Sequence, residues 1–225
     1  MDIRHSWNAL KSNFSEKYAN NKRNYNIIGL SVVGVVGGIL FYSLSYKPSQ
    51  ETKAAEKFAP MYFYFKSDST SIVLKGDAKR NIWSAVKIAD EYGSTLKGRE
   101  AALCASIAFM KEKKYEDALK YLGKTKANDK ILSASIIAMK AVCNAELGDT
   151  KDAAKLYEQA ARIDENDFAA MYLKKAGIHY EMSEDFNSAL SCYEEIAQKY
   201  ATSSEGTDIE KYIGKMKAKL GEFNP

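Results

Sequence analysis

Proline and histidine are scarce in this chain of 225 residues. The three prolines lie at positions 48, 60 and 225, and the two histidines are His5 and His179. Proline costs about 3 kcal/mol in a helix interior, so its scarcity leaves long stretches free to form helices. Good helix formers such as alanine, lysine, glutamate and leucine are abundant instead. We therefore expect an all-α fold.

The sequence also lacks the motifs that carry catalysis or cofactor binding. It has no HExxH zinc motif, no GxSxG turn, no Walker A phosphate loop and no GxGxxG dinucleotide motif. Neighbouring carboxylates such as Glu194 and Glu195 are typical of a solvated helix face. We expect no catalytic, cofactor-binding or metal-binding residues and no small-molecule substrate. An enzyme that depends on Glu194 or His179 is the least favoured alternative.

Cysteine is limited to Cys104, Cys143 and Cys192, without CxxC or CxxH spacing. An odd number excludes complete pairing within the chain. We interpret the three thiols as small buried apolar side chains.

Charge of one sign dominates only at the N-terminus. Residues 1–26 hold five basic residues against Asp2 and Glu16, whereas the remainder holds 28 basic against 27 acidic residues. A nearly neutral remainder with interspersed signs offers no electrostatic footprint for a nucleic acid. We expect no nucleic-acid partner.

A long apolar run does occur, at residues 27–46, and it contains no charged side chain. A helix of this length reaches about 30 Å, the thickness of a bilayer's hydrocarbon core. Lys22 and Arg23 precede it and Lys47 follows it, which predicts a single span with the N-terminus in the cytoplasm. Gly34 and Gly38 form a GxxxG pair, at which a second membrane helix can dock.

Two features flank this span. Residues 1–26 form a basic segment with an apolar helical stripe, which predicts a short helix lying on the membrane surface. The apolar stripe consists of Ile3, Trp7, Leu10, Phe14 and Tyr18. A signal peptide cleaved after Ser45 is the alternative, but the apolar run is as long as a membrane span, which favours an uncleaved anchor.

Residues 47–76 form a juxtamembrane segment. An apolar stripe predicts a helix over 51–65 that Pro60 kinks or ends. We expect a loop over 66–76, and then a helix from Asp77, its N-cap, to Tyr92.

An internal repeat fills the rest of the predicted domain at 77–225. Ala118, Ala153 and Ala189 are 35 and 36 residues apart, and Leu122, Tyr157 and Tyr193 follow each of them by four. The ranges are about 99–131, 134–166 and 170–202, followed by an amphipathic helix over 207–220. This spacing of small and large positions resembles the tetratricopeptide repeat, a pair of antiparallel helices of about 34 residues. The resemblance implies an α-solenoid with a C-terminal capping helix.

In such a solenoid the first helix of each pair lines a concave binding face. The resemblance therefore implies a partner-binding surface that is largely apolar and fits a hydrophobic segment or a partner helix. Its residues are Leu103, Ile107, Met110, Val142, Glu146, Met171, Lys174, Ile178, Glu181 and Met182.

The whole layout, from basic N-terminus and span through the loop at 67–77 to the repeats, resembles the YfgM-type ancillary subunit of the Sec translocon in its Bacteroidota form. This implies a single-pass protein of the bacterial inner membrane with a periplasmic repeat domain. It also implies a non-catalytic scaffold or co-chaperone whose partners are translocon subunits, a periplasmic chaperone and secreted chains. A scaffold for envelope assembly or cell division, with the same architecture, is the alternative.

Overall fold

The computed structural model describes residue 11 and the ranges 18–19, 21–163 and 167–222, and these residues are almost entirely helical or in short turns. No strand forms among them; the one bridge pairs Asp77 with Ile82. The expectation of an all-α chain is confirmed. The apolar stripe predicted within residues 1–26 lies outside the described residues except for Tyr18.

One long helix contains the apolar run. It comprises α2 (Lys22–Phe41), a π-helical turn η1 (Tyr42–Tyr46) and α3 (Lys47–Lys66), 45 residues without a break. By length and composition it can cross a membrane, and no residue of α2 is buried. Contacts divide the chain into two compact units, Met1–Thr52 and Lys53–Pro225.

Of the two outcomes predicted at Pro60, a kink or a helix end, the helix end is wrong, because α3 continues through Pro60 to Lys66. Proline removes one backbone hydrogen bond and crowds the preceding turn. Tertiary packing on both sides of Pro60 offsets this cost, since Ala54, Phe58 and Met61 of α3 are buried in the core.

The segment after α3 also differs from the prediction. A short helix α4 (Thr70–Lys75) buries Val73 and Leu74 where a loop was expected. The helix expected from Asp77 begins only at α5 (Ala85–Glu91). The Asp77 carboxylate instead accepts hydrogen bonds from the backbone nitrogens of Lys79 and Arg80, at 2.9 and 3.2 Å, and so closes a turn.

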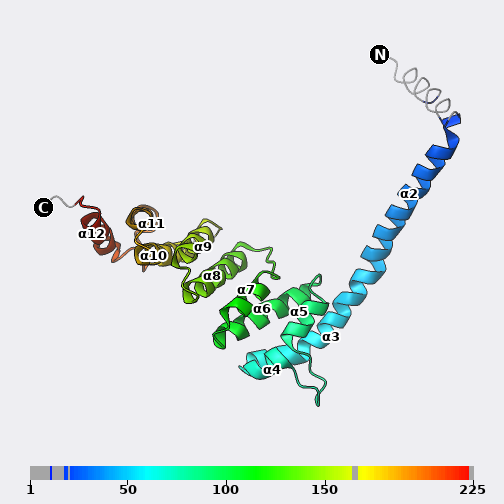
Figure 1. Ribbon diagram of the computed structural model, residues 1–225, viewed down its shortest axis with the longest axis horizontal. Helices are drawn as coiled ribbons and strands as arrows, with labels where there is room; N and C mark the ends of the chain where they lie inside the picture. Colours follow the sequence, from blue (N-terminus) through cyan, green and yellow to red (C-terminus); the bar gives the residue numbers. More distant parts are fainter. Residues whose placement is uncertain (1–10, 12–17, 20, 164–166, 223–225) are drawn as a thin grey trace. The chain divides into compact units, whose positions relative to one another are not determined.

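Seven further helices follow, and Figure 1 shows them one after another along the second unit. The main contacts join each helix from α5 to α12 to the next along the chain, and α4 packs on α5 and α6. Three consecutive pairs occupy the ranges in which the sequence predicts repeats, and α12 lies in the range of the predicted cap. They are α6 (Leu96–Lys111) and α7 (Tyr115–Leu122), α8 (Lys130–Glu146) and α9 (Thr150–Ile163), α10 (Asp167–Met182) and α11 (Phe186–Lys199), then α12 (Ile209–Lys219).

The small residues of the pattern are all in the core. Ala118, Ala153 and Ala189 are fully buried, and so are the large residues four positions later, to within 3 %. Small side chains let two helices approach closely, and the large ones fill the space beside the next helix. The sequence pattern is therefore a packing pattern.

Candidate functional site

An apolar groove lies between α3 and α6 and has a volume of about 580 Å³. We call it the α3–α6 groove. Its α3 wall consists of Ala55, Phe58, Ala59, Tyr62 and Phe65, and its α6 wall of Lys97, Glu100, Leu103, Cys104 and Ile107. Both walls belong to the second compact unit. A cavity of this size lined mainly by apolar and aromatic side chains is typical of a binding site.

The α3 wall is an aromatic ladder. The ring centroids of Phe58 and Tyr62 are 5.2 Å apart, and those of Tyr62 and Phe65 are 5.9 Å apart, with both pairs stacked. Tyr62 is 38 % exposed, whereas Phe58 is buried. The ladder therefore presents ring surface to solvent on a rigid base, which is favourable for apolar contact with a partner.

Two lysines lie against these rings. The Lys97 ammonium is 5.1 Å from the Phe58 ring centroid, and the Lys66 ammonium is 5.7 Å from that of Tyr62. Lys97 also pairs with Glu100 at 2.6 Å, so the two charges of the α6 wall neutralise each other. The groove lining has no net charge.

The thiol of Cys104 belongs to this groove but is 5 % exposed. Burial, with a smaller contribution from Glu100, raises the pKa of Cys104 to about 12. A thiol with so high a pKa is a poor nucleophile at neutral pH. Cys143 and Cys192 are free and buried too, with pKa values raised by burial to about 11 and 12.

The residues predicted to line a concave face fall into four groups. Leu103 and Ile107 lie in the α3–α6 groove. Met110 and Val142 are partly buried and pack against core clusters. Glu146, Ile178 and Met182 are exposed, Met182 most of all at 65 %.

The remaining three, Met171, Lys174 and Glu181, lie on α10. Met171 packs against the core. The Lys174 ammonium is 5.2 Å from the ring centroid of Tyr212 on α12, and Glu181 forms an ion pair with Lys215 of the same helix. The terminal helix α12 thus contacts part of the surface that the sequence assigns to a partner.

Sequence reasoning did not identify α3 as a wall of the groove. The sequence predicts one apolar stripe on this helix and therefore a single contact face. In the structure Ala54, Phe58 and Met61 point into the core, while Ala55, Ala59 and Tyr62 are exposed at the groove. The width of the stripe, which covers adjacent positions 54–55 and 58–59, was the available signal for two contact faces.

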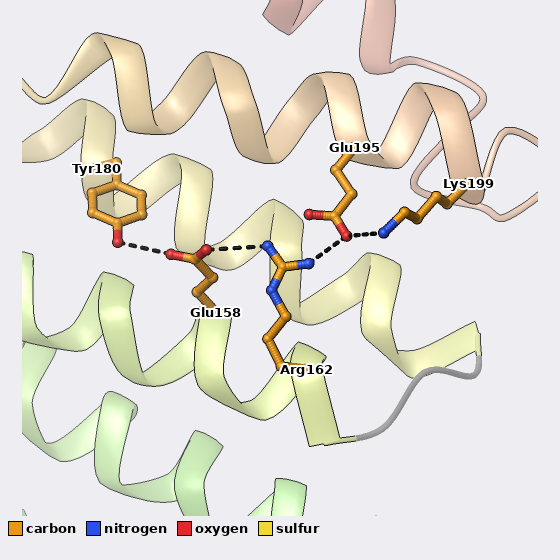
Figure 2. A network of polar contacts seen from close by, with 5 residues as sticks. All are labelled: Glu158, Arg162, Tyr180, Glu195 and Lys199. Atoms are coloured by element: carbon orange, nitrogen blue, oxygen red, sulfur yellow. Dashed lines mark hydrogen bonds and ion pairs between the residues drawn. The ribbon is translucent and has the colours of Figure 1, made fainter.

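A polar network joins α9 to the two helices of the last pair, α10 and α11 (Figure 2). Glu158 and Arg162 of α9, Tyr180 of α10, and Glu195 and Lys199 of α11 form a continuous chain of contacts. The Tyr180 hydroxyl donates to Glu158 at 3.0 Å, Arg162 contacts Glu158 at 3.2 Å and also pairs with Glu195, and Lys199 pairs with Glu195 at 3.0 Å.

These charges compensate one another. Burial opposes ionisation of Glu195, but hydrogen bonds from Arg162 and Lys199 outweigh it and hold the pKa of Glu195 below its usual value. Burial and the hydrogen bond to Glu158 raise the pKa of the Tyr180 hydroxyl. Because every member has a partner within the network, we assign it a structural role in joining α9 to α11.

No other chemistry is assembled in the part of the chain that the structure describes. It holds no group of three His, Cys, Asp or Glu side chains that could bind a metal ion. His179 stacks on Tyr157 with centroids 5.4 Å apart, and burial lowers the pKa of its imidazole. His5 lies outside the described residues.

The glycines of α2 offer a different kind of surface. A Cβ added at Gly34 or at Gly38 would meet, apart from its own chain neighbours and the adjacent helix backbone, no described atom within 4 Å. The two positions lie four residues apart and therefore on one side of the helix. This side is open to close approach.

No family model and no curated protein matches this chain.

Proposed function

We propose that this chain is a membrane-anchored interaction protein without catalytic activity, which binds protein partners through a domain of tetratricopeptide-like helix pairs. The observation that carries the proposal is the open α3–α6 groove, whose lining is apolar, aromatic and without net charge. Water-exposed apolar surface of this kind is costly unless a partner covers it.

Three features support the tetratricopeptide-like interpretation of the helix pairs. Their period is 35 to 36 residues in the sequence, close to that of the known repeat. The small residues of the pattern are fully buried. Successive helices contact their neighbours along the chain, as in a solenoid.

We propose the absence of catalytic activity from the pKa values and the contacts of the thiols and of His179. Burial raises the pKa values of the three thiols, which weakens them as nucleophiles. Burial lowers the pKa of His179, and this imidazole stacks on Tyr157. Neither arrangement provides a nucleophile next to a base, which covalent catalysis requires.

We propose that the chain binds its partners at the Sec translocon of a bacterial inner membrane, with the N-terminus in the cytoplasm and the helix pairs in the periplasm. The support is the resemblance in layout and the two basic residues before the apolar run. The partners in this proposal are channel subunits, a periplasmic chaperone and emerging secreted chains. The open side at Gly34 and Gly38 is the proposed contact with a membrane helix of the channel.

Co-purification tests this proposal. The full chain, extracted with a mild detergent that preserves the translocon, should retain channel subunits. A variant with Gly34→Leu and Gly38→Leu should retain less of them, because leucine side chains prevent close helix approach. Valine-to-leucine changes at Val32 and Val36, which keep α2 equally apolar, serve as the matched control. Recovery of outer-envelope or division proteins, with no channel subunit, would contradict the proposal and favour an envelope scaffold.

A further inference from the structure

The two walls of the α3–α6 groove have the same length. On α3 the lining residues run from Ala55 to Phe65, and on α6 they run from Lys97 to Ile107, so ten steps along the helix separate the first from the last in each case. At 1.5 Å of rise per residue, each wall is about 15 Å long. A third helix laid between two such walls would contact them over about three turns.

The spacing within each wall is also that of a helix-packing surface. On α3, positions 55, 58, 59 and 62 have i, i+3, i+4 and i+7 spacing, and so do positions 100, 103, 104 and 107 on α6. Rows of side chains at these intervals form the ridges and grooves through which helices pack. An apolar stripe with i, i+3, i+4 and i+7 spacing is the complement that such a groove accepts.

The charged residues at the groove indicate which charges a partner helix should have. Lys97 and Glu100 pair with each other, so the α6 wall of the groove has no net charge and favours an uncharged contact face. At the Phe65 end, Lys66 lies against Tyr62 and takes part in no ion pair among the residues that the structure describes. This lysine can receive a carboxylate from a partner.

We propose that the α3–α6 groove binds one amphipathic helix of a partner protein, about three turns long. The helix would have an uncharged apolar stripe and an acidic residue at the end that meets Lys66. This inference rests on the proposed function and names the kind of segment that the anchored domain recognises. The juxtamembrane helix α3 is then half of the binding site, in addition to its place in the core.

A peptide-binding measurement tests the inference. The full chain in lipid nanodiscs is titrated with a fluorescent helix-forming peptide that has leucines at i, i+3, i+4 and i+7 and a glutamate at one end. Ala59→Glu places a charge in the apolar groove and should weaken binding at least tenfold. The matched control is Phe63→Glu on the same helix, since Phe63 is 66 % exposed but outside the groove lining, and it should change the affinity less than twofold.

A charge exchange tests the acidic end. Lys66→Glu should weaken binding of the glutamate peptide several-fold and strengthen binding of a peptide that has lysine in place of the glutamate. Circular dichroism establishes that each variant keeps its helix content. The inference is overturned if Ala59→Glu and Phe63→Glu behave alike, if a scrambled peptide binds equally well, or if empty nanodiscs take up the peptide to the same extent.

The two proposals fail separately. If Ala59→Glu abolishes peptide binding but channel subunits are never recovered, the groove inference stands and the translocon assignment falls. If channel subunits are recovered but the peptide does not bind, the reverse holds.

Discussion

The helices α10 and α11 approach closely at Gly177 of α10, which lies against the ring of Tyr193 of α11. A Cβ at Gly177 would lie 2.4 Å from the Cε1 atom of the Tyr193 ring. The ring has little freedom to move, because Tyr193 is fully buried and its hydroxyl donates to Glu181 at 2.7 Å. Glycine here is required by packing, although its backbone is ordinary helix.

Gly177→Ala should therefore destabilise the domain by about 1–3 kcal/mol, the usual range for overpacking a core. Gly214→Ala is the control, because a Cβ at Gly214 of α12 meets nothing within 4 Å. Alanine there should stabilise the chain by up to about 1 kcal/mol, since it favours the helix over glycine. Denaturant unfolding of the full chain in detergent measures both. Equal effects of the two substitutions would contradict the packing assigned to Gly177.

The repeated positions were predictable at the residue scale because packing constrains them. Ala118, Ala153 and Ala189 recur in the sequence for the same reason that they are buried in the structure. The arrangement of the residues predicted to contact a partner was harder to anticipate. Leu103 and Ile107 line the groove, but Lys174 and Glu181 contact α12, which depends on where the terminal helix packs.

At the scale of elements, local signals gave some boundaries and missed others. Pro60 is a strong local signal for a helix end, yet burial of Phe58 and Met61 on either side of it keeps α3 continuous. Asp77 resembles an N-cap in sequence, but its carboxylate closes a turn onto Lys79 and Arg80 instead. In both cases contacts that no short window contains decide the outcome.

The network in Figure 2 gives an element-scale prediction about pH. The pKa of Glu195 is lower in the folded chain than its ordinary value of 4.5, so its interactions stabilise the fold above that pH. This stabilisation is lost as the pH falls through the folded pKa. The free energy of unfolding should therefore decrease on acidification below about pH 4.5, and it should decrease less in Arg162→Gln.

Unfolding curves from pH 7 to pH 3 measure this difference. Arg80→Gln is the control, because the Arg80 side chain is 62 % exposed and its pair with Asp77 contributes little to stability. An acid dependence of Arg162→Gln identical to that of the unsubstituted chain would contradict the coupling of α9 to α11 through Glu195.

At the scale of the whole molecule, one chain combines a helix that can cross a membrane with a set of packed helix pairs. A 45-residue helix carries the apolar run, and the unit from Lys53 onwards carries the helix pairs. The helix α3 contributes to both, since it follows the apolar run in sequence and supplies one wall of the groove. The all-α class and the apolar helix were predictable from composition and from the uncharged run. The groove was not, because it forms between segments about 40 residues apart.

Photo-crosslinking in living cells tests the central claim most directly. A photoreactive amino acid at Tyr62, inside the α3–α6 groove, is compared with one at Phe63 on the same turn of α3. The account predicts specific adducts from position 62 with a translocon subunit or a secreted chain, and few from position 63. Equal adducts from both positions, or adducts only with cytoplasmic proteins, would contradict it.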